Sequence, residues 1–245
     1  MLLLILAACV TALATGLGAV PVYMMGERAE RIRPLLWGSV AGIMSVASIQ
    51  GLILPGLREG ADESVAIGGL CGIAFLLLAR RRLRERQVTV GAAHEKSALR
   101  AMLVMGVLFV HSLPEGLALG AAWASDSAAL GLFIFLAIAL QNIPEGTATA
   151  IPLRDAGIGP AKAFWAAVAT SAPQPVGAVA AFVAVDAAQA LLGVSFGFAA
   201  GAMLALVAME IVPAALGGGG RLQGLLGTVA GGVVMLALGL ALDVS

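Results

Sequence analysis

The strongest constraint in this sequence is a series of long runs that contain almost no charged residue. Eight such runs are separated by short charged segments, with approximate bounds 1–25, 35–57, 63–79, 99–122, 128–153, 160–184, 190–216 and 221–242. About 20 helical residues cross the roughly 30 Å hydrocarbon core of a bilayer, so each run is of spanning length. Because helices satisfy their backbone polar groups internally in lipid, we predict an all-α polytopic membrane protein.

The composition agrees with membrane insertion. Of the 245 residues, 60% are hydrophobic and only 11% are charged, against about 25% charged residues in soluble domains. So few polar groups could not cover the surface of a water-soluble globule. The 14 basic and 14 acidic residues cancel, so the chain has no basic field for nucleic acid. We therefore expect the lipid bilayer as a partner and no nucleic acid.

The basic residues predict an orientation. Thirteen of the fourteen fall in alternate connections, and Arg58 is the exception. Five arginines lie within residues 80–86, in the longest predicted connection, a loop over 80–98. Since cytoplasmic loops are enriched in Lys and Arg, we expect this loop to be cytoplasmic and to face anionic headgroups. With eight spans, both termini then lie on the extracytoplasmic side.

Four ionisable side chains fall inside the apolar spans: His111, Glu115, Glu145 and Glu210. An ionisable residue at the centre of a membrane helix costs about 2.5–3.5 kcal/mol on insertion scales, so its presence calls for a function. A structural role in helix packing is the alternative. The arrangement of the first three argues against it.

Spans four and five carry one pattern twice. Residues 111–118 read His-Ser-Leu-Pro-Glu-Gly-Leu-Ala, and residues 141–148 read Gln-Asn-Ile-Pro-Glu-Gly-Thr-Ala. Pro114 and Pro144 lack an N–H, so each leaves a carbonyl of the preceding turn without its helical partner and is expected to bend its helix. Transporters build substrate sites where interrupted helices meet near the bilayer midplane.

The repeated pattern also brings four donor side chains together. His111 and Glu115 are four residues apart, as are Gln141 and Glu145, so each pair shares one helix face. A short connection makes the two helices antiparallel neighbours. One imidazole, two carboxylates and an amide suit a borderline divalent cation, with zinc first and iron(II), manganese or cadmium as further candidates.

The doubled Pro-Glu-Gly motif and the eight spans resemble the ZIP (Zrt-/Irt-like) family of divalent metal transporters, and the pairing of the two motifs is most similar to its bacterial GufA-type branch. The resemblance covers residues 1–245 as a single transmembrane transporter domain. It implies a 3+2+3 inverted-repeat arrangement of the helices, a homodimer, and an elevator-like movement of helices one, four, five and six. It also implies zinc uptake across the bacterial inner membrane into the cytoplasm, with no cofactor beyond the transported metal.

Carried over residue by residue, the resemblance implies a metal site of His111, Glu115, Gln141 and Glu145. Met44 in span two matches a position whose thioether can join that site. A methionine in an apolar helix is more often part of the core, so both interpretations stay open.

Some members of the family hold a second ion with polar or acidic residues of spans four, five and six. By this resemblance, the corresponding positions here are Ser112, Asn142 and Gln174, and none of them carries a charge. A second divalent ion would have to share Glu115 and Glu145 without further compensation. We therefore predict one ion per protomer.

Glu210 lies about six residues from the cytoplasmic end of span seven and resembles an acidic position of the family. It is expected to be a way-station on the cytoplasmic exit. A role as a ligand of the main site or in a structural pair is the alternative.

Two other functions fit a buried metal site. The first is an intramembrane zinc-dependent hydrolase, although the sequence has no His-Glu-x-x-His motif and His111 is its only membrane histidine. The second is a metal-sensing membrane protein that does not transport.

Overall fold

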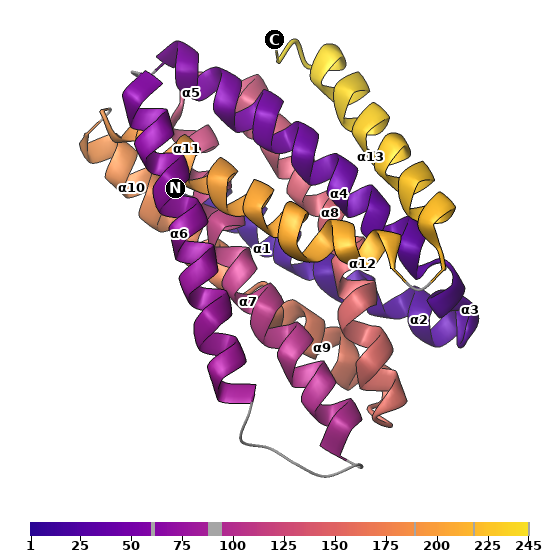
Figure 1. Ribbon diagram of the computed structural model, residues 1–245. Helices are drawn as coiled ribbons and strands as arrows, with labels where there is room; N and C mark the ends of the chain where they lie inside the picture. Colours follow the sequence, from indigo (N-terminus) through magenta and orange to yellow (C-terminus); the bar gives the residue numbers. More distant parts are fainter. Residues whose placement is uncertain (60–61, 88–94, 189, 218, 245) are drawn as a thin grey trace.

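The computed structural model describes residues 1–59, 62–87, 95–188, 190–217 and 219–244, and these residues form helices and no strand (Figure 1). Eight helical segments among them are long and apolar enough to cross a membrane: Leu2–Met25, Arg33–Arg58, Asp62–Arg82, Met105–Ala124, Ala128–Asp155, Pro160–Ala187, Leu191–Leu216 and Arg221–Ala241. The predicted all-α polytopic membrane protein with eight spans is therefore confirmed.

Half of the spans consist of more than one helix. In chain order the helices are α1 (Leu2–Leu17), α2 (Ala19–Met25), α3 (Arg28–Arg31), α4 (Arg33–Ser48), the π-helix η1 (Ile49–Ile53), α5 (Leu54–Glu59), α6 (Asp62–Gln87), α7 (Glu95–Ala124), α8 (Ala128–Asp155), α9 (Pro160–Thr170), α10 (Pro173–Ala187), α11 (Leu191–Leu206), the π-helix η2 (Val207–Ile211), α12 (Val212–Leu216) and α13 (Arg221–Ala241). Spans one, two, six and seven are the divided ones, whereas α7 and α8 are each continuous.

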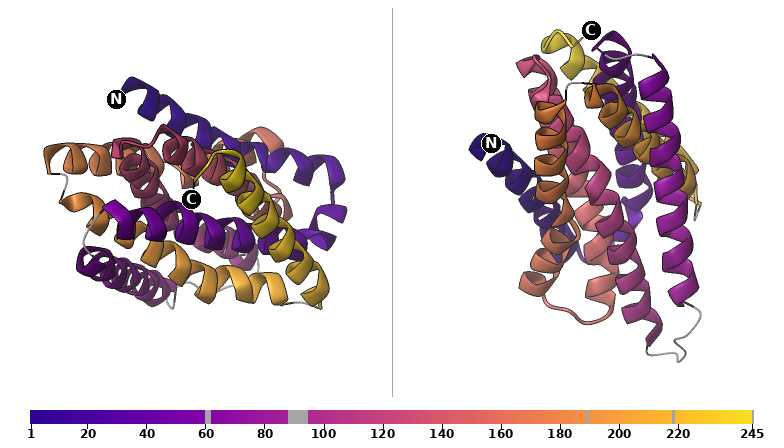
Figure 2. Two further views of the ribbon diagram at one scale, coloured as in Figure 1. Left: turned by 90° about the horizontal axis from the view of Figure 1, so that it is seen from above. Right: turned by 90° about the vertical axis from the view of Figure 1, so that its left-hand side faces the viewer.

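The connection between spans three and four is shorter than the predicted loop over 80–98. Helix α6 continues to Gln87 and α7 begins at Glu95, and α7 extends furthest at that end of the bundle (Figures 1 and 2). The apolar run marks where the membrane ends, but arginine, leucine and glutamate are strong helix formers and extend the helix past it. Residues 88–94, with His94, lie outside the described residues.

The spans pack as two groups. Helix α1 packs along α8 and α7 along α10, and we call spans one, four, five and six the site group. Helix α4 packs along α13 and α6 along α11, and we call spans two, three, seven and eight the frame group. The two groups meet where α7 contacts α11 and α8 contacts α4.

This pairing has the symmetry that the 3+2+3 arrangement requires. If spans one to three correspond to spans six to eight, the pair of spans two and eight maps onto the pair of spans seven and three. Both pairs are packed through glycines: a Cβ on Gly42 would lie 2.1 Å from Thr228 O of α13, and one on Gly72 would lie 2.1 Å from Phe198 O of α11. Small residues allow such close approach of membrane helices.

The two π-helices occupy equivalent places in spans two and seven. Each ends two residues before a proline, namely Pro55 after η1 and Pro213 after η2. A proline cannot donate to the carbonyl four residues earlier, and a π-turn is one way for a helix to absorb such a gap in its hydrogen-bond ladder. Glu210 lies within η2.

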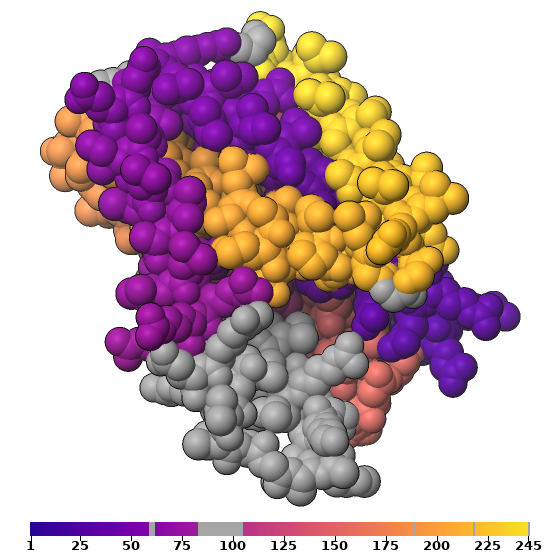
Figure 3. All heavy atoms as spheres, in the orientation of Figure 1, coloured from indigo at the N-terminus to yellow at the C-terminus, as the bar shows by residue number. Residues whose placement is uncertain are grey.

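Large apolar side chains cover much of the outside of the bundle. On the face shown in Figure 3, α6 and α13 flank α11 and α12. Leu70 on α6 is 68% exposed and Val229 on α13 is 64% exposed. A water-soluble protein would bury such residues, whereas lipid solvates them. The interior core lies between the two groups, with Phe133 and Phe196 fully buried.

Candidate metal site

The two Pro-Glu-Gly motifs lie within continuous helices. Helix α7 passes through Pro114 and α8 passes through Pro144 without ending. The helices that do break are their neighbours, α1 at Gly18 and α9 at Ser171. The interruption expected of a transporter site is therefore supplied by spans one and six, beside the motifs rather than at them.

The glycines of the two motifs bring those neighbours close. A Cβ on Gly116 would lie 2.2 Å from Gln174 O of α10, and a Cβ on Gly146 would lie 1.7 Å from Thr15 O of α1. Neither position has room for a side chain. Each motif thus presents its glutamate on a helix whose backbone is in direct contact with a broken helix.

Three of the four predicted donors converge in a buried cluster. His111 Nε2 lies 3.2 Å from Glu115 Oε1 and 3.5 Å from Glu145 Oε1. All three side chains are buried, and one ligand atom from each lies within 4.8 Å of the other two. A tetrahedral ion with bonds of about 2.0–2.2 Å holds its ligand atoms about 3.3–3.6 Å apart. The spacing therefore suits a zinc-sized cation.

Gln141, the fourth predicted donor, also adjoins the cluster. Its Nε2 donates a hydrogen bond to Glu115 Oε1. Its own Oε1 is buried and has no hydrogen-bond partner among the described residues, and His111 Nε2 and Glu145 Oε1, although 3.5 Å apart, also make no hydrogen bond there. A buried polar atom without a partner costs about 1–3 kcal/mol. All three atoms are of types that coordinate divalent metals, so a bound cation would satisfy them together.

A second layer of amides surrounds the outer oxygen of Glu115. Gln174 Nε2 donates to Glu115 Oε2 at 2.6 Å, and Asn142 Nδ2 lies 3.3 Å from Gln174 Oε1. The structure therefore places two of the predicted secondary residues beside the cluster. Ser112 instead donates its hydroxyl to Leu108 O of its own helix at 2.9 Å.

Hydroxyls from the broken helices, which were not among the predicted site residues, complete this layer. Thr11 Oγ1 lies 3.0 Å from Gln174 Oε1, and Asn142 Nδ2 donates to Thr11 O at 2.7 Å. Thr15 Oγ1 and Ser171 Oγ lie 2.6 Å apart and join α1 to the break between α9 and α10. The four-residue spacing of Thr11 and Thr15 in an apolar helix was the available signal.

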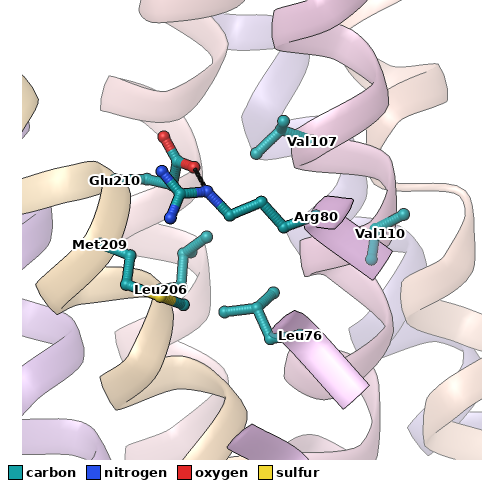
Figure 4. A pocket seen from close by; sticks show the side chains of 7 residues that line it. All are labelled: Leu76, Arg80, Val107, Val110, Leu206, Met209 and Glu210. Atoms are coloured by element: carbon teal, nitrogen blue, oxygen red, sulfur yellow. Dashed lines mark ion pairs between the residues drawn. The ribbon is translucent and has the colours of Figure 1, made fainter. Parts of the chain in front are cut away.

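The last two predicted residues lie in the frame group. Met44 is fully buried in the core where the two groups meet. Glu210 pairs with Arg80 of α6, whose Nε lies 2.6 Å from Glu210 Oε1, and both side chains line a pocket (Figure 4).

The model of the ZIP zinc transporter family matches residues 83–239, which include both motifs and all eight predicted site residues of spans four to seven. This chain belongs to the ZIP family. The match confirms the resemblance expected from the doubled motif, and it favours a transporter rather than the intramembrane hydrolase.

Bacterial members of the ZIP family are similar over almost the whole chain. Zinc transporter GufA of Myxococcus xanthus is 32% identical over 243 residues, which cover 94% of each protein. Zinc transporter ZIPB of Bordetella bronchiseptica is 32% identical over 242 residues, which cover 94% of this chain and 78% of ZIPB. A longer protein of Arabidopsis thaliana is 37% identical over 204 residues, and the match spans only 33% of that protein.

Proposed function

We propose that this protein transports zinc and related divalent cations across the bacterial inner membrane into the cytoplasm. The observation that carries the proposal is the buried set of His111, Glu115 and Glu145, whose ligand atoms are grouped at metal spacing and partly unpartnered. A purely structural cluster would pair each of these atoms with a donor or acceptor. Zinc transport is also what the names of the GufA and ZIPB relatives state for those proteins.

His111 Nε2, one oxygen each of Glu115 and Glu145, and the Gln141 carbonyl oxygen form the proposed coordination sphere. Two carboxylates balance the charge of the ion, so the occupied site is close to neutral and tolerable in a low-dielectric interior. Met44 is proposed as a further, softer ligand from the frame group. Cadmium, iron(II) and manganese fit the same donors as alternative substrates.

One ion per protomer is the proposed stoichiometry. Glu115 Oε2 already accepts a hydrogen bond from Gln174 Nε2, and the adjoining Asn142 is neutral as well. A second cation there would meet an N–H group in place of a carboxylate. It would gain no additional negative charge to offset the loss of its water.

The proposed movement follows from the two packing groups. The cluster belongs entirely to the site group, in which α7 packs on α10 and α8 on α1. Sliding this group along the frame group would carry the ion across in an elevator-like manner, and it would open the site to one side at a time. In the proposed topology both termini are extracytoplasmic, and the protein is a homodimer.

Zinc uptake into proteoliposomes that contain the purified full chain tests the proposal. Glu115→Gln keeps the side-chain volume but removes the charge, and we expect uptake to fall by at least about tenfold, as for loss of groups that support metal ligands. Asp126→Asn in the exposed turn between α7 and α8 is the matched control and should match the parent protein. Parent-like uptake by Glu115→Gln would refute the proposed site. Metal binding without uptake by the parent protein would favour a sensor.

A further inference from the structure

An arginine and a glutamate from the frame group form a partly exposed ion pair between α6 and η2. Arg80 extends from α6 and Glu210 from η2, and the two side chains are 26% and 34% exposed (Figure 4). Arg80 lies two residues before the end of the spanning part of α6. Charged residues at membrane depth are costly and pair with one another, and they mark substrate and ion pathways.

The pair lines a pocket that is otherwise apolar. Its remaining lining residues are Leu76, Val107, Val110, Leu206 and Met209. Figure 4 shows Arg80 reaching across the pocket to Glu210, with the two valines on the neighbouring helix α7. Since the other walls are aliphatic or thioether, the ion pair supplies the only full charges among the described lining residues.

The pocket adjoins the metal site along α7. Val110 directly precedes His111 in the chain, and Val107 lies one turn earlier. Both valines lie between the cluster and the end of α7 that leads back to α6. In the proposed topology this end is cytoplasmic. An ion that leaves the cluster on this side would therefore pass the Arg80–Glu210 pair.

The charges of the pair oppose such a passage. A guanidinium is ionised at every relevant pH, so Arg80 cannot lose its positive charge by releasing a proton. While Arg80 is paired, Glu210 presents no net negative charge to an approaching dication. A free Glu210 carboxylate in the same apolar pocket would attract that dication, because the low dielectric strengthens the interaction.

We propose that Arg80 is a tethered counter-cation that occupies Glu210 at rest and exchanges with the transported metal during release to the cytoplasm. This inference rests on the proposed transport function and adds a residue that controls the release step. Glu210 is then a transient cation position, and Arg80 returns to it once the metal has left. A simple structural clamp between α6 and η2 is the competing explanation.

Zinc uptake by charge variants separates the two explanations. Glu210→Gln leaves Arg80 on the path without a counter-charge, and we expect uptake to fall by about tenfold, equivalent to about 1.4 kcal/mol in the barrier. Adding Arg80→Gln to Glu210→Gln should restore most of that loss. A clamp predicts the opposite, because the double variant would be no faster than Glu210→Gln. Arg82→Gln, an exposed arginine on the same helix, is the matched control.

Zinc binding to the full chain in detergent provides a readout that does not depend on flux. Arg80→Gln frees Glu210, so calorimetry should show one more zinc per protomer than in the parent protein. Arg80→Lys keeps a cation in place and should show no additional zinc. Each variant must retain the parent zinc site, which shows that it is folded. Unchanged stoichiometry in Arg80→Gln would overturn the inference even if the parent protein transports, whereas absence of parent uptake would overturn the proposed function.

Discussion

Gln174 Nε2 donates a hydrogen bond of 2.6 Å to Glu115 Oε2, on the side of the carboxylate that faces away from His111 Nε2. One oxygen of the glutamate is thus directed to the cluster and the other is held by a neutral amide. Gln174, which belongs to the sixth span, thus fixes the orientation of Glu115, a proposed metal ligand. The same hydrogen bond occupies the Glu115 oxygen that a second cation would need.

Replacing Gln174 by glutamate should create a second cation position. The new carboxylate would face Glu115 and Asn142, and only a bound cation would relieve the repulsion between two buried glutamates. Calorimetry with zinc should then show two ions per protomer. Gln174→Leu removes the donor without adding charge and should keep the parent stoichiometry. A single ion in Gln174→Glu would show that the amide is not what limits occupancy.

A methyl group at Gly146 should disrupt the contact between α8 and α1. The added Cβ would lie 1.7 Å from Thr15 O, a backbone atom that no side-chain rotation can move away. We expect Gly146→Ala to lose at least about 1–3 kcal/mol of stability, the usual cost of overpacking. Thermal unfolding in detergent measures this. Gly232→Ala on α13, whose nearest neighbour would be 3.7 Å away, is the control and should be no less stable than the parent protein.

Met44→Leu should test the proposed thioether ligand. The exchange nearly conserves volume, so the core between the two groups stays filled. Loss of a soft ligand should lower cadmium uptake relative to manganese uptake by about threefold or more, because thioethers select softer metals. An unchanged ratio would assign Met44 to packing alone. Leu119→Met, another fully buried core position, controls for the general effect of the exchange.

The orientation can be tested with cysteine labelling in cells. The two native cysteines, Cys9 and Cys71, are exposed and would first be replaced by alanine. In the proposed topology a membrane-impermeant maleimide reaches Asp126→Cys from outside, but reaches Gly159→Cys only after permeabilisation. Both positions are exposed in turns of the bundle. The reverse labelling pattern would show the opposite orientation in the membrane and would contradict the proposed direction of transport.

The membrane fold was predictable because its signal is repeated eight times and rests on one physical requirement. A run of apolar residues of spanning length has few other stable forms, and each run became a spanning segment. Helix ends were less predictable, since hydropathy marks the lipid boundary and not the last helical residue. This is why α6 extends to Gln87, well past the predicted boundary.

The centre of the site was predictable from the cost of burying charge. His111, Glu115 and Glu145 are expensive in a membrane helix, and their spacing placed them on facing sides of α7 and α8. Thr11 and Ser171 gave no comparable signal, because a hydroxyl can bond to its own helix backbone and is tolerated without a function.

A structural pair was one alternative for Glu210, but Arg80 was not predicted as its partner. Arg80 stands at the start of an arginine-rich segment, and the whole segment was assigned to membrane orientation. Only the packing of α6 against the seventh span shows that its first arginine turns inward. Runs of like residues hide such exceptions, since composition cannot tell which member faces the protein.

At Gly116 and Gly146, the backbone of one helix lies directly against the backbone of the next, with no side chain between them. Helices joined in this way have no rotamers to change, so they resist sliding past each other. In the proposed elevator-like movement, the ligand residues of α7 and α8 would therefore move together with the first and sixth spans as one rigid body. In the proposed movement, displacement would then occur where the site group meets the frame group, and His111, Glu115, Gln141 and Glu145 would stay together from loading to release.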